Sequence, residues 1–393
     1  MMYPSRGLLV RCATMLALTT AQLARAASLF SSRPVPVVLW HGLGDSAYSE
    51  GMQSLADSLR EAFPGLFVHL VALEDRARAD QKAGVFGNVN DQVQQVCEQL
   101  ASIKELKDGF DGIGFSQGGQ FLRAYVERCN KPAMRNLVTF GSQHMGIADL
   151  PACSPADIFC RLAEGLLRGG IYTDYAQNNV VSAQYYRNPK DPRAFQNYQE
   201  KNHFLADINN ELQVNQTYIK NLKSLDNFVM LMFDKDITVE PKRSSWFSSY
   251  PVANGMNDSA HKDPRNQPLP LRQSPIYLED RLGLKKMDKR GALVFETCHG
   301  PHMRIDSACQ LKVFGKWIGT PASVLPRPVR HAWAYVNWNL LGVQVGSLPA
   351  VIQLTLFSWL LLSMLVLSRL AAVAVLKVGR TLHVPRRGKI ALS

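Results

Sequence analysis

The stretch FDGIGFSQGGQF, residues 110–121, decides the fold of this chain. Residues 110–115 predict a buried strand, and the residues that follow, as far as Cys129, predict a helix. Between them lies the G-x-S-x-G sequence of residues 114–118, in the strand–turn–helix context that a nucleophile elbow requires. Glycine on both sides of Ser116 avoids a clash with neighbouring backbone and leaves the serine Oγ exposed at the tip of a sheet. Ser116 is therefore the candidate nucleophile, and an inert loop is the alternative.

The alternation of strands and helices extends on both sides of this elbow. Further strands are predicted at residues 35–40, 66–73, 136–140, 227–233 and 292–296, and an amphipathic helix at residues 88–106. This order indicates the α/β class, with a mostly parallel sheet covered by helices on both faces. With the elbow, it predicts an α/β-hydrolase fold over residues 34–318. Residues 146–225 interrupt the sheet with helical sequence, which predicts a helical cap insertion over the nucleophile.

A serine hydroxyl is a poor nucleophile without a base and an acid that orients the base. On this fold the acid and then the histidine follow the serine along the chain. Three acids, Asp234, Asp236 and Glu240, stand near the end of the strand at 227–233. Asp236 is favoured because it is far enough past the strand to leave the sheet edge, and Asp234 is the reserve candidate. Any of the three can also be a solvated turn residue.

The base is sought after the strand at 292–296, in the sequence TCHGPHMRID. His302 is favoured because it follows the Gly300-Pro301 turn and precedes a terminal helix, and His299 is the nearby alternative. His144 also lies at a strand end, but it precedes the acid in the chain and is interpreted as structural or pocket-lining.

An oxyanion needs backbone donors, and the loop WHGLGDS (40–46) after the first strand is the expected source of one. There the N–H of Leu43 is the candidate, and His41 is expected to shape the loop. The N–H of Gln117, at the start of the elbow helix, is the second donor and is aided by the helix dipole. The chemistry built from these groups requires no metal and no organic cofactor.

Several long motifs resemble the palmitoyl-protein thioesterase 1 family: VVLWHGLGDS (37–46), GFSQGGQFLRAYVERC (114–129), NHFLADINNE (202–211) and YLEDRLGLKKMDKRGALVFETCHGPH (277–302). The resemblance runs from about Val35 to Trp317. It implies an α/β-hydrolase of the endolysosomal lumen that removes fatty acyl groups from cysteines of S-palmitoylated proteins. It also implies Ser116 as nucleophile, Asp236 as acid, His302 as base, and Leu43 and Gln117 as oxyanion donors.

The resemblance further implies two disulfides, Cys97–Cys129 and Cys153–Cys160. Cys298 and Cys309 are additional to the family pattern, and they either pair across the histidine loop or remain free. The vicinal cysteine pair that the family has after the first motif is absent, because Ala47 and Tyr48 stand there.

The two ends of the chain predict a compartment. Residues 1–26 combine arginines, an apolar run and a small-residue cleavage pattern, which predicts a secretory signal peptide; a mitochondrial presequence is the alternative. An even number of cysteines after residue 26 and the sequons at Asn215 and Asn257 agree with secretion and predict glycosylation. We therefore expect a lumenal, lysosomal or endolysosomal domain.

Toward the other end, residues 340–368 contain no charged side chain. Residues 346–368 are long enough for a transmembrane helix, since about twenty residues cross the hydrocarbon core. Residues 319–345 are expected to form a stalk, and the basic tail at 369–393 favours a cytoplasmic C-terminus. A glycolipid-anchor signal is the less favoured alternative, because its hydrophobic tail normally ends the chain.

The net charge of +12 does not indicate a nucleic-acid surface. Ten of the 44 basic residues lie before the first acid or in the last 25 residues, which leaves 34 basic against 32 acidic residues in the body. The expected activity is hydrolysis of long-chain acyl thioesters through an acyl-serine. The alternatives are an oxyester lipase or carboxylesterase with the same triad and a non-catalytic, membrane-anchored binding protein.

Overall fold

The computed structural model describes residues 34–149, 170–252 and 267–318, which all belong to one compact unit. In this part of the chain a six-stranded sheet forms, and each pair of neighbouring strands is parallel, in the order β2-β1-β3-β4-β5-β6. The strands are β1 Val37–Trp40, β2 Val68–Leu70, β3 Phe110–Phe115, β4 Met134–Phe140, β5 Asn227–Phe233 and β6 Leu293–Cys298. The chain moves outward from β1 to β2 and then returns to the other side of β1. All carboxyl ends therefore meet at one edge, where parallel α/β sheets place their sites.

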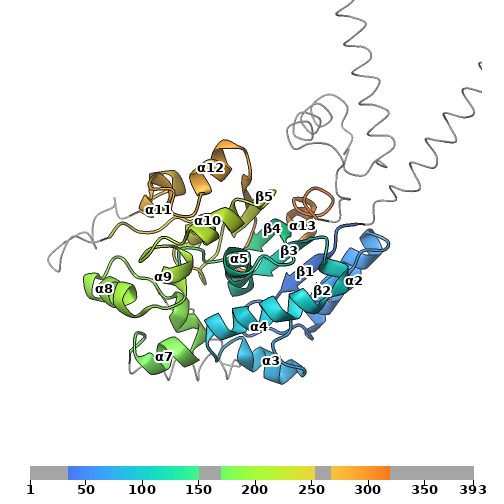
Figure 1. Ribbon diagram of the computed structural model, residues 1–393, viewed down its shortest axis with the longest axis horizontal. Helices are drawn as coiled ribbons and strands as arrows, with labels where there is room; N and C mark the ends of the chain where they lie inside the picture. The colour runs from blue at the N-terminus through green and yellow to red at the C-terminus, as the bar shows by residue number, and fades with distance from the viewer. Residues whose placement is uncertain (1–33, 150–169, 253–266, 319–393) are drawn as a thin grey trace, which may run out of the picture. The chain divides into compact units, whose positions relative to one another are not determined.

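Helices cover both faces of the sheet, as the sequence predicts (Figure 1). The α-helices are α2 Glu50–Ala62, α3 Ala77–Ala83, α4 Val89–Ser102, α5 Gln117–Arg128, α7 Asp174–Asn179, α8 Pro192–Lys201, α9 Leu205–Ile208, α10 Gln216–Leu222, α11 Pro275–Leu278, α12 Leu284–Lys289 and α13 Ser307–Leu311. Short 3₁₀ helices lie at η1 Lys104–Leu106, η3 Val181–Tyr185, η4 Lys242–Trp246 and η6 Leu271–Gln273.

Two hydrophobic clusters form on opposite faces of the sheet, because successive strand side chains point to opposite sides. Val38 and Trp40 of β1 belong to one cluster, with the apolar faces of α4 and α5. Val37 and Leu39 belong to the other, with the apolar face of α2 and Cys309 of α13. The described part of the chain thus has a three-layer α/β arrangement.

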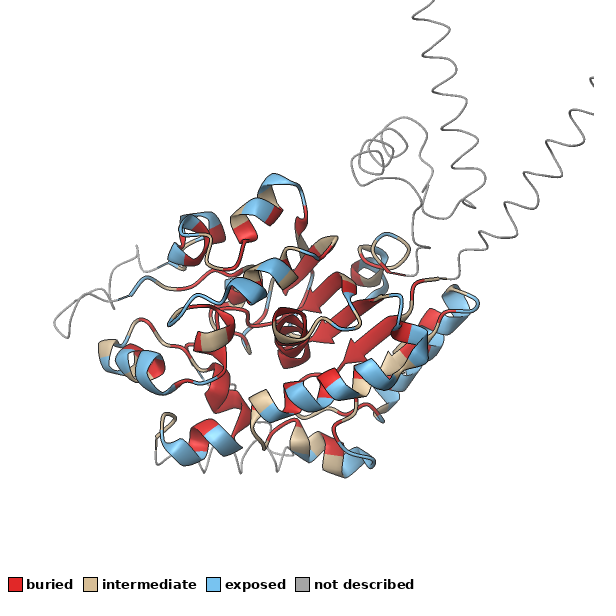
Figure 2. Ribbon diagram, viewed as in Figure 1, coloured by how far each residue is buried: buried red, intermediate tan, exposed pale blue. Residues whose placement is uncertain are grey.

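Helix α5 differs from its neighbours because it is buried almost all round, whereas α2, α4 and α8 each keep an exposed side (Figure 2). It carries a buried ion pair between Arg123 and Glu127 at 3.0 Å. Arg123 also donates to the carbonyl of Ile208 at 3.0 Å and to Asn209 Oδ1 at 2.9 Å. Burial raises the pKa of Glu127 to about 7, although Arg123 opposes the shift. The helix that follows the elbow is therefore fixed to the insertion between β4 and β5.

The helical sequence at residues 204–225 forms two separate helices. Helix α9 ends at Ile208, and α10 begins only at Gln216. Asn210 between them has a φ of 52°, in the left-handed region that interrupts a helix, and its Nδ2 donates to the carbonyl of Arg281 at 2.7 Å. The strand predicted at 66–73 is also shorter than expected, at Val68–Leu70. Strand β5 has the predicted bounds.

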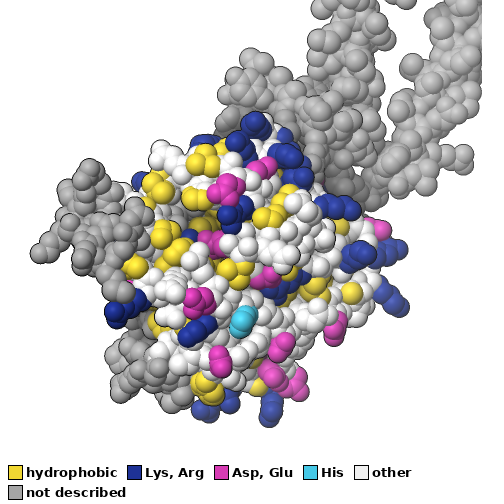
Figure 3. Space-filling model, turned by 60° about the vertical axis from the view of Figure 1, so that its left-hand side comes forward, with side chains coloured by type: hydrophobic (Ala, Val, Ile, Leu, Met, Phe, Trp, Pro, Cys, Tyr) yellow, Lys and Arg dark blue, Asp and Glu magenta, His cyan; other side chains and the backbone are white. Residues whose placement is uncertain are grey.

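Several expectations fall outside the described residues: the signal peptide (1–26), the stalk (319–345), the transmembrane helix (346–368), the basic tail (369–393), Cys153, Cys160 and Asn257. Within the described ranges, no helix is long and apolar enough to cross a membrane. On the face shown in Figure 3, basic and acidic side chains are interspersed and do not gather into a patch of one sign.

Candidate active site

Ser116 lies on the tight turn between β3 and α5, where the sequence places the elbow. Its φ of 51° and ψ of −122° are unusual for a residue with a side chain. The turn is held because Ser116 N donates to the carbonyl of Phe140, at the end of β4, at 2.8 Å. The serine is 8% exposed and lines a cavity.

The glycines around Ser116 are required by close backbone approach. A Cβ on Gly114 would lie 2.1 Å from the Cα of Gly119, and a Cβ on Gly118 would lie 2.4 Å from the carbonyl oxygens of Trp40 and His41. These separations are far below contact distance, so any side chain there would push α5 away from β1 and β3. The steric argument made from the sequence therefore agrees with the local geometry.

The structure brings His302 and Asp236 to Ser116 in one chain of polar contacts. His302 Nε2 lies 3.1 Å from Ser116 Oγ, and His302 Nδ1 lies 2.6 Å from Asp236 Oδ2. The other carboxylate oxygen of Asp236 accepts hydrogen bonds from Thr238 N at 2.9 Å and Val239 N at 3.0 Å. Asp236 follows β5 and His302 follows β6, so adjacent strands deliver the two side chains to one edge.

The two reserve candidates, Asp234 and His299, form a pair of their own. His299 Nδ1 lies 2.6 Å from Asp234 Oδ2, and the other oxygen accepts from Gly300 N at 2.7 Å. The hydrogen bond from Gly300 lowers the pKa of Asp234, and His299 adds to the shift. The His299 side chain is 76% exposed, whereas that of His302 is 14% exposed. The third acid, Glu240, accepts from the hydroxyl of Tyr250.

His144 is structural and does not line the cavity. Its ring stacks on Phe247 with centroids 4.8 Å apart, and Nε2 lies 3.1 Å from the hydroxyl of Thr139. Burial lowers the pKa of His144 well below its usual value, and the charge of Arg123 lowers it further.

The loop after β1 passes next to Ser116. A Cβ on Gly42 would lie 3.2 Å from the Cβ of Ser116, so the loop that carries Leu43 lies against the serine. Leu43 lines the cavity. In the described part of the chain, neither Leu43 N nor Gln117 N donates a hydrogen bond to another group. Both amides are thus available to a ligand atom beside Ser116.

Residues of α3 fix the loop after β1, and the sequence offered no sign of this role. Asp80 is fully buried; its carboxylate accepts from Ala47 N at 2.9 Å and Leu73 N at 2.7 Å, and lies 3.3 Å from His41 Nε2. Burial acts against ionisation of Asp80, but the nearby imidazole of His41 and the hydrogen bonds from the two amides lower its pKa. Gln81 Nε2 also donates to the carbonyl of Gly44 at 2.7 Å.

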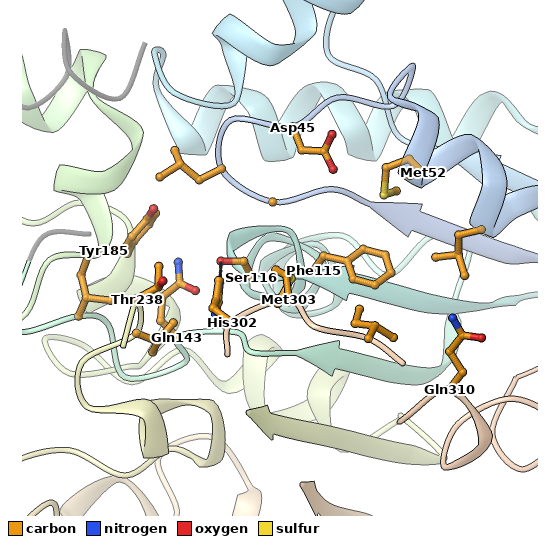
Figure 4. A pocket seen from close by; sticks show the side chains of 17 residues that line it. Asp45, Met52, Phe115, Ser116, Gln143, Tyr185, Thr238, His302, Met303 and Gln310 are labelled. Carbon is orange, nitrogen blue, oxygen red and sulfur yellow. Dashed lines mark hydrogen bonds between the residues drawn. The ribbon is translucent and has the colours of Figure 1, made fainter. Parts of the chain in front are cut away.

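A cavity of about 550 Å³ contains Ser116 and His302 and extends to both sides of them (Figure 4). Tyr185, Thr238 and Gln143 lie on one side of the serine, and Met52 and Gln310 lie on the other. We call the first side the insertion arm; its lining comprises Gln143, Tyr185 and Thr238, with Ile147 and Val239 of the same core cluster as Tyr185, and Leu43, which packs against Val180 and Ala183 of the insertion. We call the second side the α2 arm; its lining comprises Met52, Phe115, Met303 and Gln310, with Leu55 and Ile305, which pack against the same hydrophobic cluster as Met52. Gly42, Asp45 and Gly51 complete the walls.

Tyr185 and Gln143 were not singled out from the sequence. The hydroxyl of Tyr185 donates to Gln117 Oε1 at 3.1 Å, so a residue of the insertion contacts the residue after the nucleophile. Burial raises the pKa of Tyr185, which keeps the phenol protonated as a donor. For Gln143, the one signal in the sequence was its position shortly after the carboxyl end of β4.

Two disulfides lie in the described residues. Cys97–Cys129 joins the helix before β3 to the end of the elbow helix. Cys298–Cys309 joins the end of β6 to α13 and encloses both His299 and His302, which decides between the two alternatives that the sequence left open. The described residues contain no group of three or more histidine, cysteine or acidic side chains arranged to hold a metal ion.

Comparison with known proteins identifies the family of this chain. The family model for palmitoyl protein thioesterase matches residues 36–302. The chain belongs to the palmitoyl-protein thioesterase family. It is 39% identical over 292 residues to palmitoyl-protein thioesterase 1 of Caenorhabditis elegans, covering 74% of this chain and 92% of that protein. It is 32% identical over 268 residues to palmitoyl-protein thioesterase 3 of Dictyostelium discoideum, covering 68% and 84%.

A more distant relative is the lysosomal thioesterase PPT2 of Rattus norvegicus, 27% identical over 266 residues and covering 66% of this chain and 78% of that protein. Among solved structures, the α/β hydrolase GrgF from Penicillium matches with a TM-score of 0.36 and 11% identity, covering 72% of this chain and 88% of that one.

Proposed function

We propose that this chain hydrolyses thioesters that join long-chain fatty acids to cysteines of lipidated proteins. The observation that carries the proposal is the contact chain from Ser116 Oγ through His302 to Asp236, in a cavity with largely apolar walls. Membership of the palmitoyl-protein thioesterase family supports the substrate class.

Acylation begins when Ser116 Oγ attacks the thioester carbonyl. The proton of the hydroxyl passes to His302 Nε2, and Asp236 stabilises the imidazolium through Nδ1. The amides of Leu43 and Gln117 bind the oxyanion; loss of one such donor typically costs about 10²- to 10³-fold in rate. The C–S bond then breaks, and the cysteine leaves as a thiolate that takes up the proton. Thiolate is a good leaving group because a thiol pKa is about 8.5.

Deacylation repeats the same steps with water as the nucleophile. His302 takes a proton from the water, whose oxygen attacks the acyl-serine carbonyl, and the same two amides bind the second oxyanion. Ser116 leaves and recovers its proton from His302, and the fatty acid is released. Every proton transfer in this scheme uses a group within the observed contact chain.

The acyl chain is assigned to the insertion arm. Ile147, Tyr185 and Val239 belong to the core cluster on the insertion side of the sheet, so this arm continues into apolar packing. Burial of a palmitoyl chain contributes about 0.8 kcal/mol for each CH₂, and so dominates binding. In this proposal the helical insertion at 146–225 serves as the cap over the nucleophile.

The test is hydrolysis of paired S-palmitoyl and O-palmitoyl substrates by the purified domain, with Ser116→Ala as the inactive control. We expect turnover of the thioester, loss of that turnover in Ser116→Ala, and unchanged thermal unfolding of the variant. Near-normal thioesterase activity in Ser116→Ala would overturn the proposal. Preferential hydrolysis of the oxyester would instead favour a lipase or carboxylesterase, and failure to label with a fluorophosphonate would favour a binding protein.

We also propose a lysosomal or endolysosomal location with the domain in the lumen. Two disulfides in the described residues suit an oxidising compartment, and a relative carries the name lysosomal thioesterase. Asn215 is exposed and is offered as a glycosylation site.

Residues 346–368 are proposed as a single-pass membrane anchor on their sequence alone. Carbonate extraction of membranes that contain the full chain tests this anchor. Retention in the membrane fraction is expected, and release into the supernatant would contradict the anchor.

A further inference from the structure

The two arms of the cavity lie toward opposite faces of the sheet. Ile147, Tyr185 and Val239 of the insertion arm belong to the core cluster that contains α4 and α5. Met52 and Phe115 of the α2 arm belong to the cluster on the other face, with Leu55, Met303 and Ile305 packed against it. Ser116 stands between the arms at the end of the sheet (Figure 4). A substrate whose reacting carbonyl lies at Ser116 therefore has two separate apolar directions open to it.

An acyl thioester has two substituents on its reacting carbonyl, the fatty acyl chain and the sulfur of the leaving group. The acyl chain occupies the insertion arm in the function proposed above, on which this inference rests. The sulfur must depart beside His302, because the proton that it receives is held at Nε2. Met303 directly follows His302, Ile305 comes from the same loop, and Gln310 lies in α13, the helix that follows it. The α2 arm is thus bounded by the residues that surround the departing sulfur.

The lining of the α2 arm fits an amino-acid side chain better than a second hydrocarbon chain. Met52 and Met303 are flexible and polarizable, so they adapt to side chains of different shapes. Gln310 offers a donor and an acceptor, and the carboxylate of Asp45 offers an acceptor, at the wall of the same cavity. A peptide backbone has N–H and C=O groups to pair with them, whereas a fatty chain has none.

We propose that the α2 arm binds an apolar side chain next to the acylated cysteine of the substrate protein. Leu55 and Ile305 supply the apolar contact, and Gln310 is the polar partner for the peptide backbone. The arm makes this enzyme selective for the residue that flanks the cysteine, independently of acyl-chain length. Binding there affects acylation alone, since the acyl-serine that remains is the same for every leaving group.

The experiment uses S-palmitoyl peptides with leucine or glycine beside the cysteine, and a minimal S-palmitoyl cysteamine thioester. Wild-type enzyme is expected to show a kcat/KM about tenfold higher for the leucine peptide than for the glycine peptide. Leu55→Trp fills the arm and should reduce this ratio to near one, by lowering kcat/KM for the leucine peptide more than for the glycine peptide. Leu55→Ala enlarges the arm and should shift the preference toward phenylalanine or tryptophan.

Thr238→Trp is the matched control, because Thr238 lines the insertion arm. It should lower the ratio of C16 to C8 acyl substrates and leave the leucine-to-glycine ratio unchanged. Absence of a flanking-residue preference in wild-type enzyme overturns the inference, as does a loss of C16 preference in Leu55→Trp, which would place the acyl chain in the α2 arm. Failure of the proposed function itself is distinguishable, since wild-type enzyme would then leave the minimal thioester intact.

Discussion

Two carboxylate–imidazole pairs connect the same two loops of this protein, and only one of them serves Ser116. Asp236 with His302 and Asp234 with His299 have the same Nδ1-to-oxygen distance of 2.6 Å. In the first pair the aspartate side chain is fully buried, and the second imidazole nitrogen is 3.1 Å from Ser116 Oγ. In the second pair the histidine is 76% exposed and the aspartate 34% exposed.

The comparison shows that a close aspartate–histidine contact does not by itself define a catalytic pair. A catalytic imidazole must also point its free nitrogen at the nucleophile from an environment that excludes bulk water. The Asp234–His299 pair, called here the outer pair, instead joins the loop after β5 to the loop after β6. Asp234 accepts from Gly300 N, and Lys235 N donates to the carbonyl of Gly300 at 3.1 Å. We interpret it as a support that holds the loop bearing His302 beside the loop bearing Asp236.

The largest difference in activity between the two pairs is expected when each histidine is replaced in turn. His302→Ala is expected to lower kcat by about 10⁵-fold or more, because no group remains to accept the proton of Ser116. His299→Ala is expected to keep most of the activity. Steady-state thioesterase assays on both variants, with circular dichroism to confirm folding, measure the difference. An inactive His299→Ala beside an active His302→Ala would reverse the assignment of the base.

Substitution of the two aspartates should show the same difference between the pairs, with a smaller loss of kcat. Asp236→Asn keeps the shape of the side chain but offers an amide where a carboxylate stabilises the imidazolium, so kcat should fall by about 10⁴-fold. Asp234→Asn should remain close to wild type in kcat. Because Ser116, His302 and Asp236 act as a unit, the double variant His302→Ala/Asp236→Asn should lose little more than His302→Ala. A clearly additive loss would contradict that shared role.

The smallest expected effect is on stability, and it concerns the outer pair. The lowered pKa of Asp234 means that its ionised form stabilises the fold above the unfolded pKa of about 3.9, and that this contribution disappears as pH falls through the lower folded value. Asp234→Asn should therefore have a lower Tm than wild type near pH 5, with the gap narrowing below about pH 4. Thermal unfolding from pH 6 to pH 2 measures it, with the exposed Asp75→Asn as control. A gap that does not change with pH would exclude this linkage.

The elements around the elbow could be predicted because their signals are local. Gly114 and Gly118 stand at fixed positions around Ser116, and residues 228–233 of strand β5 are a continuous apolar run. The order of acid and histidine after the serine narrowed the search to two short loops. A choice within each loop needs the tertiary placement, since Asp234 and Asp236 both follow β5 and both contact a histidine.

Other parts of the site depend on contacts between residues far apart in the chain. Asp80 is an ordinary acid in a polar helix by its sequence, and it becomes important only because Ala47 N and Leu73 N meet its carboxylate. Tyr185 has no pattern around it that points to the Gln117 side chain 68 residues away. The turn at Asn210 likewise follows from its hydrogen bond to Arg281, which no local propensity encodes.

Because of the Cys298–Cys309 disulfide, the specific activity of the enzyme is expected to depend on the redox state of the compartment in which it is produced. Its two cysteines are almost completely buried and are separated by 11 positions, and the loop between them carries His302, Met303 and Ile305. A recombinant host that keeps thiols reduced would yield a chain with every catalytic side chain present but no covalent closure of this loop. Preparations from a reducing cytosol and from a secretory pathway would then differ in specific activity at equal purity, so expression yield alone is a poor guide to active enzyme.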